Sequence, residues 1–368
     1  MKFREFSKIV FIGTYQDDKI YSGPTLYVRK IIDSYSFSDA SFYFYNSSAT
    51  IIEKLFQKQS LNMSKDHYQI GIIRLFFELF RTKPAIIHLL DFQRIFIFVG
   101  FIKNFINCKF LYTIHGSVVE EDRLKQELPY FYQIKNKMAE KIIFKNASVL
   151  ISFNEDLAQR CKEQSKSKAI IKRIPAGIDD MYFLSRRKFI QLNQRLHIVC
   201  IGGFTTREQS CIELLGKLEK AADLIFVTLV GFANDCIQNA PKFIDISAIN
   251  KLEQSEWCNL LNNADIFLNT YPNETYSIAT LEAMASECVV ISLDHLKISE
   301  LITDGENGYR YKISYPEYVI EIIETLGRNS PLRYSIGHEA RKSVNTLRWG
   351  NCVEVHQAIY LDILREIG

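Results

Sequence analysis

The stretch NTYPNETYSIATLEAMA, Asn269 to Ala285, decides the fold. It follows the apolar run Ile266 to Leu268, which predicts a buried strand, and its second half predicts a helix that contains Glu282. Glu274 lies on the loop before that helix, so two carboxylates flank a helix N-terminus, where N–H groups and the helix dipole favour a phosphate. Carboxylates on both sides of a phosphate site predict a sugar nucleotide as the ligand. A capped amphipathic helix with a solvated or ion-paired Glu282 is an equally frequent alternative.

Outward from this stretch, apolar runs alternate with polar turns and helical segments in two series. Strands are predicted at 8–14, 41–45, 86–90, 109–114, 149–152 and 170–174, and then at 197–201, 224–230, 243–246, 266–268 and 289–292. The polar segment Ser185 to Arg195 is the predicted linker. The sequence therefore predicts an α/β fold of two Rossmann-like, doubly wound parallel-sheet domains that face each other across a cleft.

The predicted domains are 1–185, for the acceptor, and 186–345, for the nucleotide sugar; 346–368 is expected to be a helix that packs back on the first domain. A chain of 368 residues is long enough for two domains, and 47% hydrophobic with 24% charged residues is typical of a soluble globular protein. The longest uncharged apolar run near the N-terminal half, Ile95 to Ile102, is far short of the roughly 20 residues that span a bilayer.

The N-terminus shows no export signal, and the eight cysteines form no C-x-x-C pair, so we expect a cytoplasmic protein with reduced cysteines. Residues 1–190 hold 30 Lys and Arg against 19 Asp and Glu, whereas the remainder holds 15 against 23. This basic first half favours an anionic partner, and peripheral contact with an anionic membrane is the prediction. The helical segment Ile70 to Arg81 could rest on a bilayer, although packing against a sheet is the more frequent role of such a face. Nucleic acid is not predicted, because its usual motifs are absent.

Two candidate site residues follow strands of the first domain. His115 and Gly116 come directly after the strand 109–114, where open α/β sheets bind ligands. Gly23, in the turn after the first strand, would let a ligand approach the backbone closely. A structural histidine and a plain tight turn are the ordinary alternatives at these two positions.

The chain resembles the family-4 glycosyltransferases of the GT-B fold, which are retaining enzymes that use nucleotide-sugar donors. The resemblance rests on the order and spacing of motifs along nearly the whole chain. These motifs are SGP at 22–24, TIHG at 113–116, NASVLISFNED at 146–156, IPAGID at 174–179, NETYSIATLEAMA at 273–285 and ELITDGENGYRY at 300–311.

The resemblance implies a role for each candidate residue. Glu282 would accept hydrogen bonds from both ribose hydroxyls, and Glu274 would contact the donor sugar near the reacting carbon. The helix start formed by Tyr276, Ser277 and Ile278 would bind the diphosphate, and Gly23 would let the first loop approach it. His115 would line the reaction site beside the sugar. No cofactor beyond the UDP- or GDP-sugar donor and no metal are expected.

Several positions depart from the family pattern. The family usually has an arginine just after the glycine that ends the first strand of the second domain, and a lysine about five residues later. Gly203 and Glu208 occupy these places, and Glu208 would repel a diphosphate. Arg207 is the expected substitute cation. Glu287 stands where a glycine is common.

The expected function is transfer of a sugar, with retention, to a hydroxyl of a lipid-linked saccharide in the biosynthesis of O-antigen, capsule or lipopolysaccharide. The expected place is the cytoplasmic face of the inner membrane. Gly203 and Glu208 motivate an alternative, a GT-B protein without donor chemistry that acts as a binding partner or scaffold in a polysaccharide assembly complex. An epimerase or phosphorylase of the same fold is the third interpretation.

Overall fold

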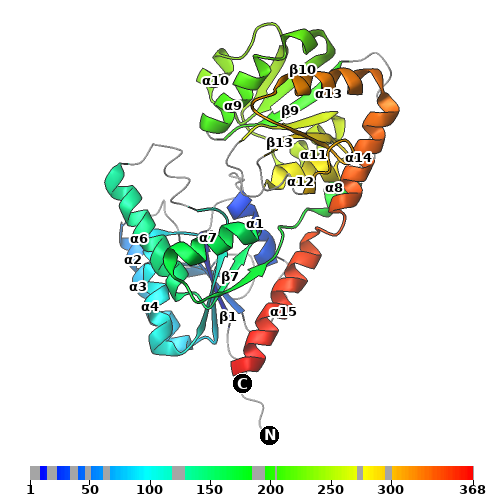
Figure 1. Cartoon of the computed structure of the whole chain (residues 1–368). Helices are drawn as coiled ribbons and strands as arrows, with labels where there is room; N and C mark the ends of the chain where they lie inside the picture. The colour runs from blue at the N-terminus through cyan, green and yellow to red at the C-terminus, as the bar shows by residue number, and fades with distance from the viewer. Residues whose placement is uncertain are drawn as a thin grey trace. The chain divides into compact units, whose positions relative to one another are not determined.

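The computed structural model describes residues 9–14, 23–33, 40–45, 51–60, 67–117, 129–184, 195–203, 205–271, 277–294 and 301–367. The chain forms two compact units (Figure 1). Unit 1 comprises residues 1–177 and 349–368, and unit 2 comprises residues 178–348. The boundaries predicted from the sequence lie at 185 and 345. Of the predicted linker, Ser185 to Arg195, all but Arg195 lies outside the described residues.

Unit 1 contains an eight-stranded sheet in the order β3-β4-β2-β1-β5-β6-β7-β8. All neighbouring strands are parallel except β3, which runs antiparallel to β4 at one edge. The strands are β1 (Ile9–Thr14), β2 (Ala40–Tyr45), β3 (Lys58–Ser60), β4 (His67–Ile70), β5 (Ile86–Leu89), β6 (Lys109–Ile114), β7 (Val149–Ser152) and β8 (Ile170–Arg173). The central strands are buried almost throughout, as expected for a parallel sheet that is covered on both faces.

Helices connect these strands. They are α1 (Gly23–Asp33), α2 (Ile51–Phe56), α3 (Ile72–Thr82), η1 (Arg94–Phe96), α4 (Ile97–Ile106), α6 (Tyr130–Asn146) and α7 (Glu155–Ser165). In Figure 1, α2, α3, α4 and α6 gather on one side of unit 1. Contacts between α2 and α3 and between α4 and α6 confirm that these pairs are neighbours.

Unit 2 has a six-stranded sheet, entirely parallel, in the order β11-β10-β9-β12-β13-β14. Its strands are β9 (Leu196–Ile201), β10 (Ile225–Val230), β11 (Asp245–Ile249), β12 (Ile266–Asn269), β13 (Val289–Leu293) and β14 (Tyr309–Tyr311). Its helices are α8 (Asp180–Leu184), α9 (Thr205–Leu215), η2 (Glu219–Leu224), α10 (Asn234–Gln238), α11 (Gln254–Asn263), α12 (Ile278–Ala285), α13 (Glu317–Arg328) and α14 (Ser330–Val344). The prediction of two doubly wound parallel-sheet domains is confirmed.

The last helix, α15 (Trp349–Ile367), belongs to unit 1. The Tyr360 hydroxyl is 2.7 Å from Nδ1 of His88 on β5, and Nε2 of His356 is 2.6 Å from the Tyr27 hydroxyl on α1. All four side chains are fully buried. A paired polar network in a core fixes one arrangement of its helices, because any other arrangement leaves buried groups without partners.

In the described part of the chain, no helix is both long enough and apolar enough to cross a bilayer. The same residues contain no cluster of three or more His, Cys, Asp or Glu side chains that could hold a metal ion. All eight cysteines are described, and none forms a disulfide.

Candidate functional site

In the sheet of unit 2, the direction in which successive strands are added reverses between β9 and β12. β9 comes first in the chain; β10 and β11 lie on one side of it, and β12, β13 and β14 lie on the other. Ligands of open parallel sheets bind outside the carboxyl ends of the strands at such a switch point. The loops that follow Ile201 and Asn269 are therefore where the fold itself places a ligand.

Two glycines shape the loop after β9. A Cβ on Gly202 would lie 2.6 Å from the carbonyl oxygen of Gly231, so a side chain does not fit there. Gly203 is exposed and has a φ of +102°, which L side chains rarely adopt. An arginine at residue 203, where the family pattern places one, would strain this backbone.

Arg207, in the first turn of α9, joins the two loops of the switch point. Its guanidinium carbon lies 4.8 Å from the ring centroid of Tyr271, which follows β12. Its Nη1 donates a hydrogen bond of 3.3 Å to the carbonyl oxygen of Gly202. A positive charge thus stands at the switch point although both cations of the family pattern are absent.

Glu208 turns inward. Its Oε1 accepts a hydrogen bond from the Gly203 N–H at 3.0 Å, and its Oε2 accepts one from the Ala233 N–H at 2.9 Å. The residue is only 3% exposed. Each oxygen of its carboxylate therefore accepts a hydrogen bond from the backbone, and together these bonds connect the loop after β9 to the start of α10. The two N–H donors offset part of the carboxylate's charge, which still lies next to the Gly203 backbone.

The second loop leads into α12, which begins at Ile278. Ser277 is its N-cap, and the Ser277 Oγ accepts a hydrogen bond of 3.3 Å from the Thr280 N–H. The Asn269 side chain, at the end of β12, donates to the Thr280 hydroxyl over 3.1 Å. These contacts hold the N-terminus of α12, with its dipole and first-turn N–H groups, at the carboxyl edge of the sheet.

Glu282 lies on α12 with its carboxylate between α8 and α11. The Trp257 Nε1 on α11 donates a hydrogen bond of 2.8 Å to the Glu282 Oε2. The Tyr182 ring comes from α8; burial, and then the nearby Glu282 carboxylate, raise the pKa of its hydroxyl. Glu282 is 6% exposed. A carboxylate has about four lone-pair sites, and these neighbours fix its orientation.

Glu287, in the turn after α12, has a φ of +63°. This left-handed conformation accounts for the glycine that is common there, because a non-glycine residue in it costs about 1–2 kcal/mol. The Glu287 Oε1 lies 3.1 Å from Nη1 of Arg341, so an ion pair with α14 offsets part of that cost.

Two predicted site residues, Glu274 and Tyr276, lie outside the described residues. In unit 1, Gly23 is the first residue of α1. His115 follows β6, and its Nε2 is 2.8 Å from the carbonyl oxygen of Leu90. Because a carbonyl only accepts, Nε2 carries the proton and Nδ1 has the acceptor lone pair. Burial lowers the pKa of His115 to about 4, so the ring is neutral at pH 7.

The sheet of unit 1 has its own switch point, between β1 and β5, and a buried acid lies there. The Oδ2 of Asp91, after β5, accepts hydrogen bonds from the N–H of Thr14, at 3.1 Å, and from its hydroxyl. The Gln93 Nε2 donates to that hydroxyl over 3.2 Å. Burial raises the pKa of Asp91 to about 6.

Sequence reasoning missed Trp257, Tyr182, Tyr271 and Asp91. Asp91 and Tyr271 carried a usable signal, since each follows a buried strand in the same way as His115. Trp257 and Tyr182 reach Glu282 from other helices, and no local spacing marks such a contact.

Residues 197–343 match the family model described as "Glycosyl transferases group 1". Unit 2 thus carries a group 1 glycosyltransferase domain. The domain covers the switch-point loops, Arg207, Ser277 and Glu282. "Putative glycosyltransferase EpsD" of Bacillus subtilis (strain 168) is 32% identical over 101 residues, which are 27% of this chain and 26% of that protein. The chain therefore matches about a quarter of the length of this curated relative.

Solved structures match nearly the whole chain. HepE from Anabaena in complex with UDP-glucose has a TM-score of 0.72 at 14% identity, with 97% of this chain and 100% of that chain covered. The lipopolysaccharide outer core galactosyltransferase WaaB, in its apo form, has a TM-score of 0.70 at 13% identity, with 96% and 99% covered. At these identities the likeness shows the fold, which is GT-B.

Proposed function

We propose that this chain is a retaining, family-4 glycosyltransferase that moves a hexose from a UDP- or GDP-sugar to a hydroxyl of a lipid-linked saccharide. The observation that carries the proposal is the arrangement at the switch point of unit 2. A cation, Arg207, the N-terminus of α12 and the buried carboxylate of Glu282 belong to one group 1 domain. Together they match the diphosphate and the ribose of a nucleotide sugar in charge and hydrogen-bonding capacity.

Each part of the donor has a proposed partner. Glu282 accepts hydrogen bonds from the ribose hydroxyls. The backbone of Tyr276, Ser277 and Ile278, together with Arg207, binds the diphosphate and stabilises the charge that develops on it as the sugar departs. Glu274 binds the transferred sugar near its reacting carbon. Gly23 and Gly203 have no side chain, so phosphate oxygens can approach their backbone closely.

His115 is proposed to accept a hydrogen bond from a sugar hydroxyl. Its neutral state and its Nε2–H tautomer support this role, because Nδ1 is then an acceptor. In the reaction, the bond between the anomeric carbon and the diphosphate oxygen breaks and the acceptor oxygen bonds to the same face of that carbon. A diphosphate oxygen takes the proton of the acceptor hydroxyl. Arg207 and the helix N-terminus stabilise the leaving group in place of a metal ion.

The proposed setting is the assembly of a surface polysaccharide, such as O-antigen, capsule or lipopolysaccharide, at the cytoplasmic face of the inner membrane. The structural neighbour WaaB, a lipopolysaccharide outer core galactosyltransferase, supports it by analogy of fold. The basic charge of unit 1 supports contact with anionic lipids.

Thermal unfolding of the full chain with UDP- and GDP-sugars tests the proposal. A donor that binds the folded state raises the melting temperature, by linkage. Release of UDP or GDP on addition of a membrane extract that contains lipid-linked saccharides then identifies transfer. A well-folded sample that responds to no nucleotide sugar contradicts the proposal.

One observation favours a second candidate, a scaffold without donor chemistry. Glu208 occupies the Gly203 N–H, a backbone donor that a phosphate could otherwise use. Under this alternative Arg207 serves only to join the two loops. Transfer of the sugar by the parent, with loss of transfer when Arg207 is replaced, excludes the alternative.

A further inference from the structure

The described part of unit 1 exposes an unusual set of apolar side chains. Six of the seven exposed phenylalanines of the described residues lie on four helices of this unit, and the seventh, Phe243, lies in unit 2. The exposed apolar side chains of these helices form what we call the aromatic surface: Phe56 on α2, Phe76 and Phe77 on α3, Phe101 and Phe105 on α4, and Tyr130, Phe131, Tyr132, Ile134 and Met138 on α6. Isolated exposed apolar residues are normal, but a collection of this kind marks an interaction site.

These side chains lie on helices that are neighbours in unit 1. α2 contacts α3, and α4 contacts α6. Between α3 and α4, the Phe80 ring lies 4.8 Å from Phe76 and 6.5 Å from Phe105 by centroids. The four helices lie together on one side of unit 1 in Figure 1. Phe77 is 62% exposed and Phe105 is 75% exposed, so the largest apolar groups point into solvent.

The same helices present positive charge. Within residues 67–117 and 129–146, every acidic residue is buried: Glu78, Asp91 and Glu140. The exposed charged side chains of these ranges include eight cations on or beside the helices: Arg74, Arg81, Lys83, Arg94, Lys135, Lys137, Lys141 and Lys145. The exposed aromatic groups thus stand among cations, with one exposed acid, Glu53, on the described helix α2.

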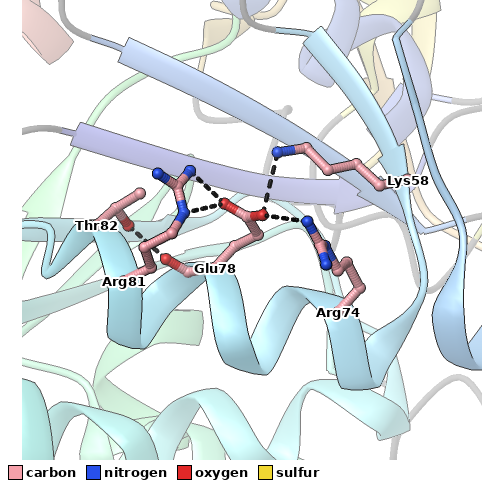
Figure 2. Close-up of polar contacts among 5 residues, drawn as sticks. All are labelled: Lys58, Arg74, Glu78, Arg81 and Thr82. Atoms are coloured by element: carbon pink, nitrogen blue, oxygen red, sulfur yellow. Dashed lines mark hydrogen bonds and ion pairs between the residues drawn. The ribbon is translucent and has the colours of Figure 1, made fainter.

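The Glu78 carboxylate on α3 is surrounded by cations (Figure 2). Lys58 and Arg74 each lie 3.2 Å from its Oε1, and the Arg81 Nη2 lies 2.6 Å from its Oε2. Glu78 is buried, whereas the side chains of Arg74 and Arg81 are 51% and 67% exposed. Three cations around one buried anion leave a surplus of positive charge beside Phe77.

Cations also lie directly over aromatic rings of α6. The Lys135 Nζ is 4.1 Å from the centroid of Phe131, and the Arg94 guanidinium carbon is 4.9 Å from that of Tyr132. An aromatic ring with a cation beside it suits the boundary between acyl chains and headgroups, where the ring enters the apolar layer and the cation meets a phosphate.

We propose that the aromatic surface is the part of this protein that inserts into the headgroup layer of an anionic lipid bilayer. Charge complementarity favours an anionic bilayer, because eight cations are exposed to meet lipid phosphates while the acids of the same ranges are buried. The proposal deepens the proposed function and rests on it in one respect: a lipid-linked acceptor is held at the bilayer surface. A second copy of the chain that docked through the same surface would leave the surplus of positive charge unmatched.

Sedimentation with vesicles tests the proposal on the full chain. We expect binding to vesicles of equimolar phosphatidylglycerol and phosphatidylcholine, weaker binding in high salt, and little binding to phosphatidylcholine alone. Failure to bind the anionic vesicles at low salt, or equal binding to both kinds, overturns the proposal.

Substitutions then locate the surface. Phe77→Glu and Phe105→Glu change exposed side chains, and each should weaken binding to the anionic vesicles about tenfold or more. Phe243→Glu, at an exposed position of unit 2, is the matched control and should bind like the parent. Equal binding by all three variants overturns the assignment. A parent dimer in light scattering that Phe105→Glu converts to a monomer assigns the surface to a second copy and also overturns it.

Stabilisation by nucleotide sugars separates this proposal from the proposed function. Phe77→Glu and Phe105→Glu should keep the parent's thermal shift with a UDP- or GDP-sugar, which also shows that they are folded. A parent that binds vesicles through this surface but no nucleotide sugar supports the surface and contradicts the glycosyltransferase. A parent that binds the nucleotide sugar but not the vesicles supports the glycosyltransferase and contradicts the surface.

Discussion

The indole N–H of Trp257 donates a hydrogen bond of 2.8 Å to the Glu282 carboxylate, the group that we propose binds ribose. The two residues come from neighbouring helices, α11 and α12. A hydrogen bond to a charged group contributes about 1.5–3 kcal/mol, and it also fixes the direction of the remaining lone pairs. Trp257 is therefore a positioning residue for the donor site.

Trp257→Phe keeps the apolar bulk and removes the donor. We expect about tenfold weaker binding of UDP or GDP, because the Glu282 carboxylate loses its fixed direction. The binding of a 2′-deoxy nucleotide should change much less, since it already lacks one ribose hydroxyl. Titration calorimetry with both nucleotides measures this. Trp349→Phe, at the other tryptophan of the chain, is the control in unit 1. Equal losses for both nucleotides would show a merely structural role.

Arg207→Ala should weaken the binding of a nucleoside diphosphate about tenfold or more, because charge-assisted hydrogen bonds to phosphate are lost. The free nucleoside has no phosphate, so its affinity should not change. Equilibrium binding of UDP and uridine, or of GDP and guanosine, distinguishes a lost phosphate contact from a general loss of binding. Arg195→Ala, an exposed residue that pairs with Asp245, is the control. An unchanged affinity for the diphosphate would assign Arg207 to loop structure alone.

Glu208→Ala should lower the free energy of unfolding by about 2–3 kcal/mol, since the Gly203 and Ala233 N–H groups lose a charged acceptor. Urea unfolding of the variant measures the loss. Glu213→Ala, at an exposed position of the same helix, should change stability by less than about 0.5 kcal/mol. If the two variants are equally stable, Glu208 does not tie the loops together.

The buried histidines of unit 1 make stability depend on pH. Burial lowers the pKa of His356 from 6.5 to about 4 and lowers that of His88 as well. Below pH 6.5 the unfolded chain therefore binds protons that the folded chain excludes. The stabilisation is fully present above pH 6.5 and is lost as the pH falls towards 4, by up to about 3 kcal/mol for His356.

Urea unfolding between pH 7 and pH 4 should show this fall in the parent, and the fall should be shallower in His356→Gln, which does not titrate. A slope that His356→Gln leaves unchanged contradicts the buried neutral state of His356.

The fold was predictable from the sequence because buried parallel strands are continuous apolar runs. All eleven strands predicted from such runs are present within a few residues of their predicted ends. The strands that were missed are β3, β4 and β14, which are short and lie at or next to sheet edges. β3 is exposed and reads KQS, so no apolar run marks it.

The candidate site was predictable only in part. The position of His115 followed from the end of a strand and that of Ser277 from the start of a helix, whereas Arg207 followed from the family pattern. The inward turn of Glu208 did not, because it depends on the Ala233 N–H, which the sheet brings close from a different loop. The backbone angles of Gly203 and Glu287 were not predictable either. A family pattern gives the residue that is common at a position but not the φ angle that favours that residue.

The binding of nucleotide sugars by Glu282→Gln tests the central claim most directly. Calorimetry or thermal unfolding compares the parent with this variant, which keeps an amide oxygen opposite the Trp257 N–H but has no charge. We predict that the parent binds a UDP- or GDP-sugar and that the variant binds it about tenfold or more weakly, with a smaller loss for the 2′-deoxy nucleotide. Equal affinity of parent and variant, or no binding by a folded parent, would contradict the account.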